Sequence, residues 1–399
     1  MKQFITLLLL LTVTPCLRAQ KTKVSNIRQE LGQARSYIKS GKYTEAEKLM
    51  TNLLKDSANR ANKRIYLTWY DAVRGQYEAG NEKLYLKQPY DTAAFFTLTK
   101  RMFAVAETLD SLDMKPDAKG RVALDYRAKH ASQMNAIRPN LFNGGTFHVR
   151  KTKWKEAFDF LETYIDCARQ PLFASYGYAD SDQRMPEAAY WATYCGYRMN
   201  DAVLTLRYHQ LALQDSARAD FTLQFIAEAR RWLKDEELYL ATLQEGFRRF
   251  PQFPYFFPRL MDIYTSRGQY EQALAVADSA LAVNDSSQLF VFAKSSTLLR
   301  LGRYEESIEY SNKLLALNDS MPEAYFNAGT AYVSMTNGKD TRKDRKFIRS
   351  CYQKARSYME HYRALAPDEK EKWAPLLYRI YLNLNMGRQF DEIDRLLRK

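Results

Sequence analysis

The sequence is poor in the residues that build catalytic and metal centres. It has four histidines in 399 residues, and none stands in the His-Glu-x-x-His spacing that is typical of zinc sites. It also lacks a glycine-rich phosphate-binding loop and the Gly-x-Ser-x-Gly turn of serine hydrolases. Asp235, Glu236 and Glu237 are adjacent acids, but they fall at an expected helix start, where negative charge stabilises exposed backbone amides. We therefore predict a protein that is not an enzyme and that needs neither a cofactor nor a metal.

Long apolar runs are also scarce. The N-terminus, MKQFITLLLLLTVTPCLRAQ, places a short apolar stretch after Lys2 and a small residue, Ala19, before Gln20. This order is typical of a secretory signal peptide, here residues 1–19, and the stretch is too short to span a bilayer. No other segment approaches the roughly 20 apolar residues of a transmembrane helix. We therefore predict an exported, periplasmic protein with no transmembrane segment, and leave an association with the outer membrane open.

Cysteine is rare and uneven in number. Cys167, Cys195 and Cys351 remain after signal cleavage, and an odd number cannot be fully paired in an oxidising compartment. Their helical contexts favour buried small apolar side chains, while a bridge between Cys167 and Cys195 stays open. Cys16 leaves a lipid anchor as the alternative to cleavage, although Pro15 stands where lipoprotein signals resemble one another in having Gly, Ala or Ser.

One short pattern returns at a fixed distance in the second half of the chain. The separation between Gly268 and Gly302 equals the separation between Tyr270 and Tyr304. A shared period of this length, about 34 residues, indicates a stack of helical hairpins. The two copies therefore predict a repeat architecture.

The first copy shows how the hairpin is built. Tyr270, Ala273, Ala277 and Ala280 follow one another at spacings of 3, 4 and 3, which places them on one face of a helix. Gly268 precedes them and can take the positive φ that ends the helix before it. A single hairpin cannot cover its own apolar face, so it must stack on further copies.

This pattern resembles the tetratricopeptide repeat (TPR), which has Gly-x-Tyr at its turn and alanines in its second helix. Further copies are marked by Gly41 and Tyr43, by Gly145 and Trp154, by Tyr325 and Gly329, and by Ala355 and Pro367. We count about eight candidate hairpins over most of the chain. The resemblance implies an all-α fold, a TPR-like right-handed superhelical solenoid of stacked helix-turn-helix hairpins.

Two parts of the chain follow the repeat differently. Residues 20–135 are expected to hold one TPR hairpin and elongated helices broken near Pro89, with Asp91 or Thr92 as the next cap. Residues 136–399 are expected to form the TPR array, with a basic insertion at about 336–350. The combination resembles exported TPR proteins of the Bacteroidetes, and that resemblance implies no catalytic residue.

The TPR resemblance implies a non-enzymatic scaffold or adaptor in the bacterial envelope, whose first helices line a concave face for a protein or peptide partner. By repeat register, the candidate partner-binding residues are Phe142, Asn143, Thr146, Arg150, Arg259, Asp262, Phe326, Asn327 and Thr330. Some TPR proteins clamp a terminal carboxylate with lysine and asparagine, but Asn143 and Asn327 lack the matching lysines. We expect a monomer or a weak oligomer. The alternative is a glycan-binding or nutrient-binding envelope protein related to TPR-containing nutrient-binding lipoproteins.

The insertion raises a second candidate surface. It is dense in cations, of which Arg342, Lys343, Arg345 and Lys346 form the candidate basic contact. These residues form either a solvated turn or a contact for an acidic partner or an anionic envelope component. Nucleic acid is not an expected partner of an exported chain, although the net charge is +14.

A short motif, Asp followed by Ser or Thr and then an apolar residue, recurs along the chain. It resembles the acceptor sequence for O-linked glycans on exported Bacteroidetes proteins, and it also suits helix caps. The candidate O-glycosylation residues are Ser57, Thr92, Ser111, Ser216 and Ser320. Ser279 carries the motif within an expected helix, so it is the poorest candidate.

Overall fold

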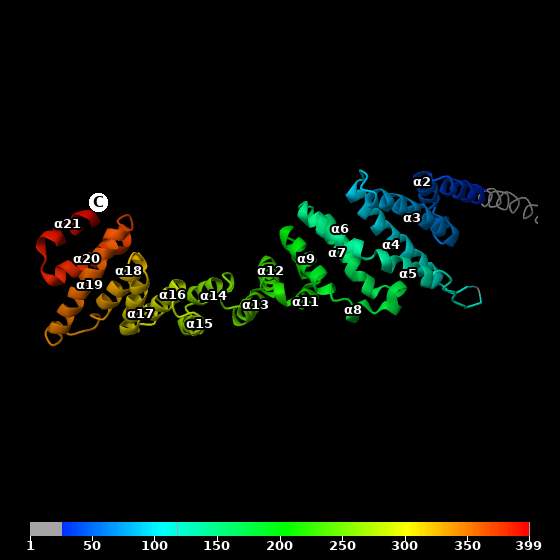
Figure 1. The fold of residues 1–399 in the computed structure, drawn as a ribbon. Helices are drawn as coiled ribbons and strands as arrows, with labels where there is room; N and C mark the ends of the chain where they lie inside the picture. The colour runs from blue at the N-terminus through cyan, green and yellow to red at the C-terminus, as the bar shows by residue number, and fades with distance from the viewer. Residues whose placement is uncertain (1–25, 118, 399) are drawn as a thin grey trace, which may run out of the picture. The chain divides into compact units, whose positions relative to one another are not determined.

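The computed structural model describes residues 26–117 and 119–398, and the regular secondary structure within these ranges is helical, without a β-strand. The all-α prediction is therefore confirmed. The chain divides into two compact units, unit 1 (Met1–Leu233) and unit 2 (Lys234–Lys399), whose helices are coloured along the chain in Figure 1. Among the described helices, none has both the length and the apolar character needed to cross a bilayer. The predicted signal peptide and Cys16 lie outside the described residues.

Unit 1 begins with helical residues 26–39 and contains both long and short helices. The longer ones are α2 (Tyr43–Leu53), α3 (Lys63–Tyr85), α4 (Thr92–Asp113), α5 (Arg127–Ile137), α6 (Pro139–Arg150), α7 (Trp154–Asp166), α9 (Met185–Arg198) and α12 (Ala219–Trp232). The short ones are α8 (Tyr178–Ser181), α10 (Ala202–Arg207), α11 (His209–Ala212) and the 3₁₀ turns η1 (Ser57–Asn59), η2 (Cys167–Arg169), η3 (Pro171–Tyr176) and η4 (Ser216–Arg218). Helices α3 and α4 pack together, as do α6 with α7 and α7 with α9.

The two elongated helices of unit 1 end where the sequence indicates. Helix α3 stops at Tyr85, shortly before Pro89, and α4 starts at Thr92. The carboxylate of Asp91 accepts hydrogen bonds from the backbone N–H groups of Ala93 and Ala94, at 2.9 and 3.2 Å. Because these amides have no partner inside the helix, Asp91 supplies the missing acceptor. The cap is therefore Asp91 rather than Thr92.

Unit 2 is more regular. Its helices are α13 (Glu236–Arg249), α14 (Phe256–Ser266), α15 (Tyr270–Val283), α16 (Gln288–Arg300), α17 (Tyr304–Leu317), α18 (Pro322–Ser334), α19 (Arg345–Leu365), α20 (Lys370–Leu384) and α21 (Gly387–Leu397). From α14 onward they pair as hairpins, and each second helix packs on the first helix of the next hairpin. The first helices α16 and α18 also contact each other, as do α18 and α20. Contacts of this kind make a continuous stack.

The repeat residues of unit 2 do what the pattern predicts. Gly268 and Gly302 have φ angles of +69° and +75°, a left-handed conformation that glycine adopts without steric cost. Ala273, Ala277 and Ala280 have no exposed surface. The absence of a larger side chain at these positions lets neighbouring helices approach closely.

The three described cysteines are free and buried. Burial raises the pKa of the Cys167 and Cys195 thiols to about 12, so both stay protonated at neutral pH. The interpretation of these residues as buried small apolar side chains is confirmed, and the structure has no bridge between Cys167 and Cys195.

The sequence predicts a boundary between two parts of the chain at residues 135 and 136. This position lies within α5, inside unit 1, and the boundary stays a prediction. The two compact units divide instead at Leu233 and Lys234, in the turn between α12 and α13. The acids Asp235, Glu236 and Glu237 mark a helix start here in the sequence, but nothing in the sequence distinguishes this turn from the other turns as a boundary between units.

Candidate partner-binding groove

A groove runs along the first helices of the unit 2 hairpins. It consists of two neighbouring cavities that share Ser296 and Arg300. The first, of about 610 Å³, is lined by Asp262, Thr265, Ser266, Tyr270, Ser296, Thr297 and Arg300. The second, of about 540 Å³, is lined by Phe292, Ser296, Leu299, Arg300, Tyr304, Glu323, Phe326, Asn327, Thr330, Ser334, Tyr362 and Lys372. We call these residues the groove.

The lining positions repeat with the period that separates Gly268 from Gly302. Asp262, Ser296 and Thr330 follow one another at this period, and all three line the groove. The same period relates three further lining residues, which are Ser266, Arg300 and Ser334. Equivalent positions of successive hairpins therefore face one continuous surface, as expected when similar units stack.

The groove combines apolar and charged side chains. Phe292, Leu299 and Phe326 come from α16 and α18 and are partly buried, so their outer faces remain available for contact. Arg300 supplies positive charge at the second cavity, while Lys372 is paired with Glu369 at 2.6 Å and Glu323 adds a negative charge. Such a mixture suits a peptide that presents both an apolar and an acidic side chain.

Arg300 differs from the nearby arginines in having no ion-pair or hydrogen-bond partner among the described residues. Its side chain is exposed at the last residue of α16, and it makes no ion pair or hydrogen bond with any residue between 26 and 398 that the structure describes. By contrast, Arg267 pairs with Glu236 at 3.0 Å, and Arg303 pairs with Glu306 at 2.6 Å. Arg300 is thus free to bind an acceptor from outside.

Thr330 also offers an unused polar group. Its hydroxyl Oγ1 is buried, lies on a residue that lines the second cavity, and has no hydrogen-bond partner among the described residues. A buried hydroxyl without a partner destabilises a fold by about 1–3 kcal/mol. This hydroxyl is therefore an unpaired polar atom beside the second cavity.

The structure places the unit 2 candidates differently from one another. Asp262 is exposed in the groove, and Phe326 and Thr330 are partly buried there. Arg259 stacks on Tyr255, 3.7 Å from the ring centroid, and donates a hydrogen bond to the Tyr255 carbonyl at 3.0 Å. It is therefore engaged at the start of α14 and does not line either cavity.

Asn327 was expected to face outward, and this expectation was wrong. Asn327 is 5% exposed, and its Nδ2 donates to the Ser295 hydroxyl at 3.2 Å. It occupies the repeat position of Ala293, which is also buried, so this register position packs between helices. Asn327 reaches the groove only at its edge.

The unit 1 candidates all lie on α6, and none lines either cavity of the groove. Asn143 and Arg150 are exposed, and Thr146 is partly buried and donates to the Asn143 carbonyl at 3.1 Å. Phe142 corrects the prediction, because it is buried with its ring 5.8 Å from that of Tyr164. An aromatic side chain at this position serves the core rather than a binding surface.

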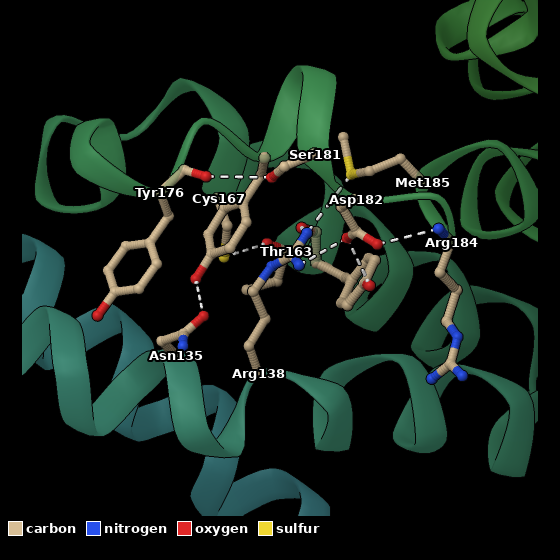
Figure 2. A network of polar contacts seen from close by, with 11 residues as sticks. Asn135, Arg138, Thr163, Cys167, Tyr176, Ser181, Asp182, Arg184 and Met185 are labelled. Carbon is tan, nitrogen blue, oxygen red and sulfur yellow. Dashed lines mark hydrogen bonds and ion pairs between the residues drawn. The ribbon is translucent and has the colours of Figure 1, made fainter.

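A network of polar contacts in unit 1 was not predicted from the sequence (Figure 2). Arg138 lies between the rings of Tyr164 and Tyr178, 3.8 Å from each centroid, and pairs with Asp182 at 2.6 Å. Burial alone would raise the pKa of Asp182, but hydrogen bonds from Tyr164 and Arg138 outweigh it and lower that pKa. The two charges compensate each other, although Nε of Arg138 has no hydrogen-bond partner among the described residues, and this pairing indicates a structural role.

The cluster fastens an irregular segment to regular helices. Arg138 also donates to the Tyr164 carbonyl at 3.0 Å, while Tyr178 donates to Asn135 at 2.7 Å. Segment η2–η3–α8, which departs from the repeat, is thereby tied to α5, α6 and α7. Arg138 and Asp182 are 44 residues apart, so no local spacing could have predicted their pairing.

The motif residues for O-glycosylation fall mainly at helix starts. Ser57, Ser111, Ser216 and Ser320 are exposed, and Thr92 is partly buried. Three of the preceding aspartates accept backbone N–H bonds, namely Asp56 from Ala58, Asp91 from Ala93 and Asp215 from Ala217. The interpretation of these three motifs as caps is therefore confirmed, and it leaves the exposed hydroxyls accessible.

Stacked helical hairpins with a groove along their first helices define a helical repeat protein. Residues 262–322 match the family model of the tetratricopeptide repeat. Within these residues the match agrees with the repeat that the sequence pattern predicts. The match covers α15, α16 and α17, including the residues from Asp262 to Arg300 that line the first cavity.

Three solved structures illustrate what the chain is similar to. The C-terminal part of a TPR repeat-containing protein from Cytophaga hutchinsonii is 11% identical, with 63% of this chain and 92% of that chain covered and a TM-score of 0.43. Yeast Tom70 is 10% identical, with 92% and 89% covered and a TM-score of 0.33. The TPR2AB domain of yeast Sti1, in a pHSP90 complex, is 14% identical, with 75% and 96% covered and a TM-score of 0.26. No curated protein sequence matches the chain significantly.

Proposed function

We propose that this chain is a non-enzymatic scaffold that holds a segment of a protein partner in the groove of unit 2. The observation that carries the proposal is the periodic lining, in which Asp262, Ser296 and Thr330 present equivalent positions of three successive hairpins. A surface that repeats along a stack suits an extended or helical segment, because such a partner repeats its own contacts along its length.

The chemistry of the groove favours a partner segment with an acidic residue beside an apolar one. Arg300 has no partner among the described residues, so a carboxylate can bind it without first breaking an ion pair. Phe292 and Phe326 occupy equivalent positions of successive hairpins and line the same cavity, where they can cover an apolar side chain. The hydroxyl of Thr330 can bind the partner's backbone.

The proposed setting is the bacterial envelope. It rests on the N-terminal sequence, where Lys2, a short apolar stretch and Ala19 follow the order of a signal peptide. We also propose O-linked glycans at the exposed Ser57, Ser216 and Ser320 of the exported chain. The mass of the native protein should then exceed that of its polypeptide and fall when these serines are replaced by alanine. An unmodified native mass would remove the glycan proposal alone.

Crosslinked capture from envelope fractions would first identify a partner peptide. Calorimetric titration with this peptide then tests the groove. Arg300→Ala should weaken binding by about 10-fold or more, because hydrogen bonds to charged groups contribute about 1.5–3 kcal/mol. Arg248→Ala is the matched control, since Arg248 is exposed on α13, lies outside the groove and carries the same charge.

The melting temperature of both variants should stay close to that of the wild type, because exposed side chains contribute within about 0.5 kcal/mol. Equal binding by Arg300→Ala and Arg248→Ala would contradict the proposal. A soluble glycan that binds in the groove with the same dependence on Arg300 would favour the glycan-binding alternative instead.

A further inference from the structure

The connection between α18 and α19 is a folded turn rather than a loose loop. The carboxylate of Asp340 accepts the backbone N–H groups of Arg342 and Lys343, both at 2.8 Å. The carboxylate of Asp344 in turn accepts the N–H of Asp340 at 2.9 Å. At the start of the turn, Arg379 of α20 donates to the side chain of Asn337 at 2.7 Å. The backbone that carries the charged side chains of this turn is therefore set by the fold.

Both acids of the turn are committed to the backbone, which leaves its cations without partners. The cations are Lys339, Arg342, Lys343, Arg345, Lys346 and Arg349, and they are exposed or at most partly buried. Within the part of the chain that the structure describes, none of them forms an ion pair or a side-chain hydrogen bond. We call these six residues, with Phe347, the cationic turn. Asp340 and Asp344 form no ion pair with these cations among the described residues.

Three of these cations lie where the helix dipole disfavours positive charge. Arg345, Lys346 and Arg349 occupy the first turns of α19, close to the positive end of its dipole. The N-cap residue, Asp344, is acidic, but its carboxylate makes no cap hydrogen bond to the first turn of α19 and forms no ion pair with these cations among the described residues. Acidic or neutral residues would suit a merely solvated turn better, so folding of α19 does not explain these three side chains.

An aromatic side chain lies among the cations. Phe347 is 42% exposed, between Lys346 and Arg349 in the sequence, and the Lys339 ammonium lies 5.6 Å from its ring centroid. None of the seven residues lines either cavity of the groove. Exposed cations around an exposed aromatic side chain are the combination that binds the interface of an anionic bilayer.

We propose that the cationic turn docks unit 2 onto an anionic lipid surface. The cations contact headgroup phosphates, and Phe347 enters the boundary between headgroups and acyl chains. An acidic protein segment is the less favoured partner, because a bound segment needs a lined groove and these side chains do not line one of the described cavities. This contact is independent of peptide binding by the groove, which lies on other residues.

The experiment is co-sedimentation of the full chain with vesicles of phosphatidylglycerol mixed into an excess of phosphatidylcholine. The variant K343Q/R345Q/K346Q should reduce the partition coefficient by about 100-fold, since each cation near an anionic surface adds roughly 1 kcal/mol. Salt should weaken wild-type binding, because the Debye length shortens from about 10 Å at 0.1 M to about 3 Å at 1 M. Phe347→Ser should weaken binding several-fold while the net charge is unchanged.

The matched control is K42Q/K48Q/K55Q, which removes the same charge from exposed positions of unit 1. It should bind vesicles nearly as the wild type does. Equal losses in the two triple variants would overturn the proposal, since they would show an effect of net charge alone. Binding to vesicles of pure phosphatidylcholine, or to poly-glutamate and not to the anionic vesicles, would overturn it as well. Circular dichroism of every variant must match that of the wild type.

Discussion

Unit 1 has a kind of helix contact that is added to the one it shares with unit 2. In both units, alanines with no exposed surface, such as Ala157 and Ala277, lie between the helices and allow close approach. In unit 1, buried carboxylates pair with cations across long stretches of chain, as Asp110 does with Arg127 and Asp182 with Arg138. Small residues repeat and therefore produce a regular stack. Charged pairs are specific to one place and can fix a segment that departs from the stack.

The largest expected effect comes from breaking the charged pair in unit 1. Arg138→Met leaves the partly buried Asp182 without its ion pair, and breaking a buried pair costs up to about 3–5 kcal/mol. Hydrogen exchange should show lost protection in α6, α7 and α9, with protection in α15–α18 unchanged. Arg169→Met is the control, because Arg169 is exposed and only 4.0 Å from Asp166, at the limit of an ion pair. Equal effects of the two substitutions would contradict a structural role for Arg138.

The second prediction concerns the pH dependence of stability, which should distinguish unit 1 from unit 2. Burial, together with the nearby charge of Asp166, raises the pKa of Glu107 on α4 from 4.5 to about 7. The folded chain therefore keeps a proton that the unfolded chain releases near pH 4.5. This stabilisation is complete below pH 4.5 and is lost as the pH rises through 7. Unfolding of unit 1 should become easier by about 2 kcal/mol between pH 5 and pH 8.

Glu107→Gln tests that assignment, because glutamine does not titrate. Urea unfolding, followed by hydrogen exchange in α4, should lose its dependence on pH over this range in the variant. If the pH dependence of the variant equals that of the wild type, another group is responsible.

An effect of similar size is expected when one close helix approach in each unit is compared. A Cβ on Gly196 would lie 2.4 Å from the backbone nitrogen of Thr205, which cannot move without shifting α10. A Cβ on Gly329 would lie 2.5 Å from the sulfur of Met359, and that side chain can change rotamer. Gly196→Ala should cost about 2–3 kcal/mol and Gly329→Ala about 1 kcal/mol or less, measured by urea midpoints. The reverse order would show that the helices of unit 1 yield more easily.

The smallest effect is a gain of stability in unit 2. Arg345→Gln and Lys346→Gln remove positive charge from the first turn of α19, so each should stabilise the fold by about 0.3–1 kcal/mol at low salt. Thermal unfolding at low and at high NaCl concentration provides the measurement. The gain should shrink at high salt, because screening weakens charge–dipole interactions. Loss of stability in either variant would mean that these cations support the turn.

The repeat itself could be predicted from sequence because its determinants are local. Gly268, Tyr270 and the alanines after them indicate the turn and the buried face, and the structure confirms both. Asp262 lines the groove, and the repeat period then predicts that Ser296 and Thr330 line it as well. Of these two residues, only Thr330 was among the candidates predicted from the sequence. Arg300 follows in the same way from Ser266.

The rest depends on contacts that no local pattern encodes. Phe142 and Asn327 were expected to face outward, yet one packs on Tyr164 and the other bonds Ser295, because a helix position between two neighbouring helices is covered on both sides. The pairing of Arg138 with Asp182 joins residues that are 44 apart. The absence of partners around Arg300 likewise depends on where every nearby carboxylate lies in space.

The central claim is that the partner lies in the groove along the first helices of unit 2, and site-specific photocrosslinking tests it most directly. p-Benzoylphenylalanine would replace Ser296, which both cavities share, and in a second variant Glu309, which is exposed on α17 and lies outside the groove. The account predicts that the partner crosslinks at position 296 and not at position 309. A third variant would carry the probe in place of Phe347. Crosslinking at position 309 alone, or at position 347 without crosslinking at position 296, would contradict the claim.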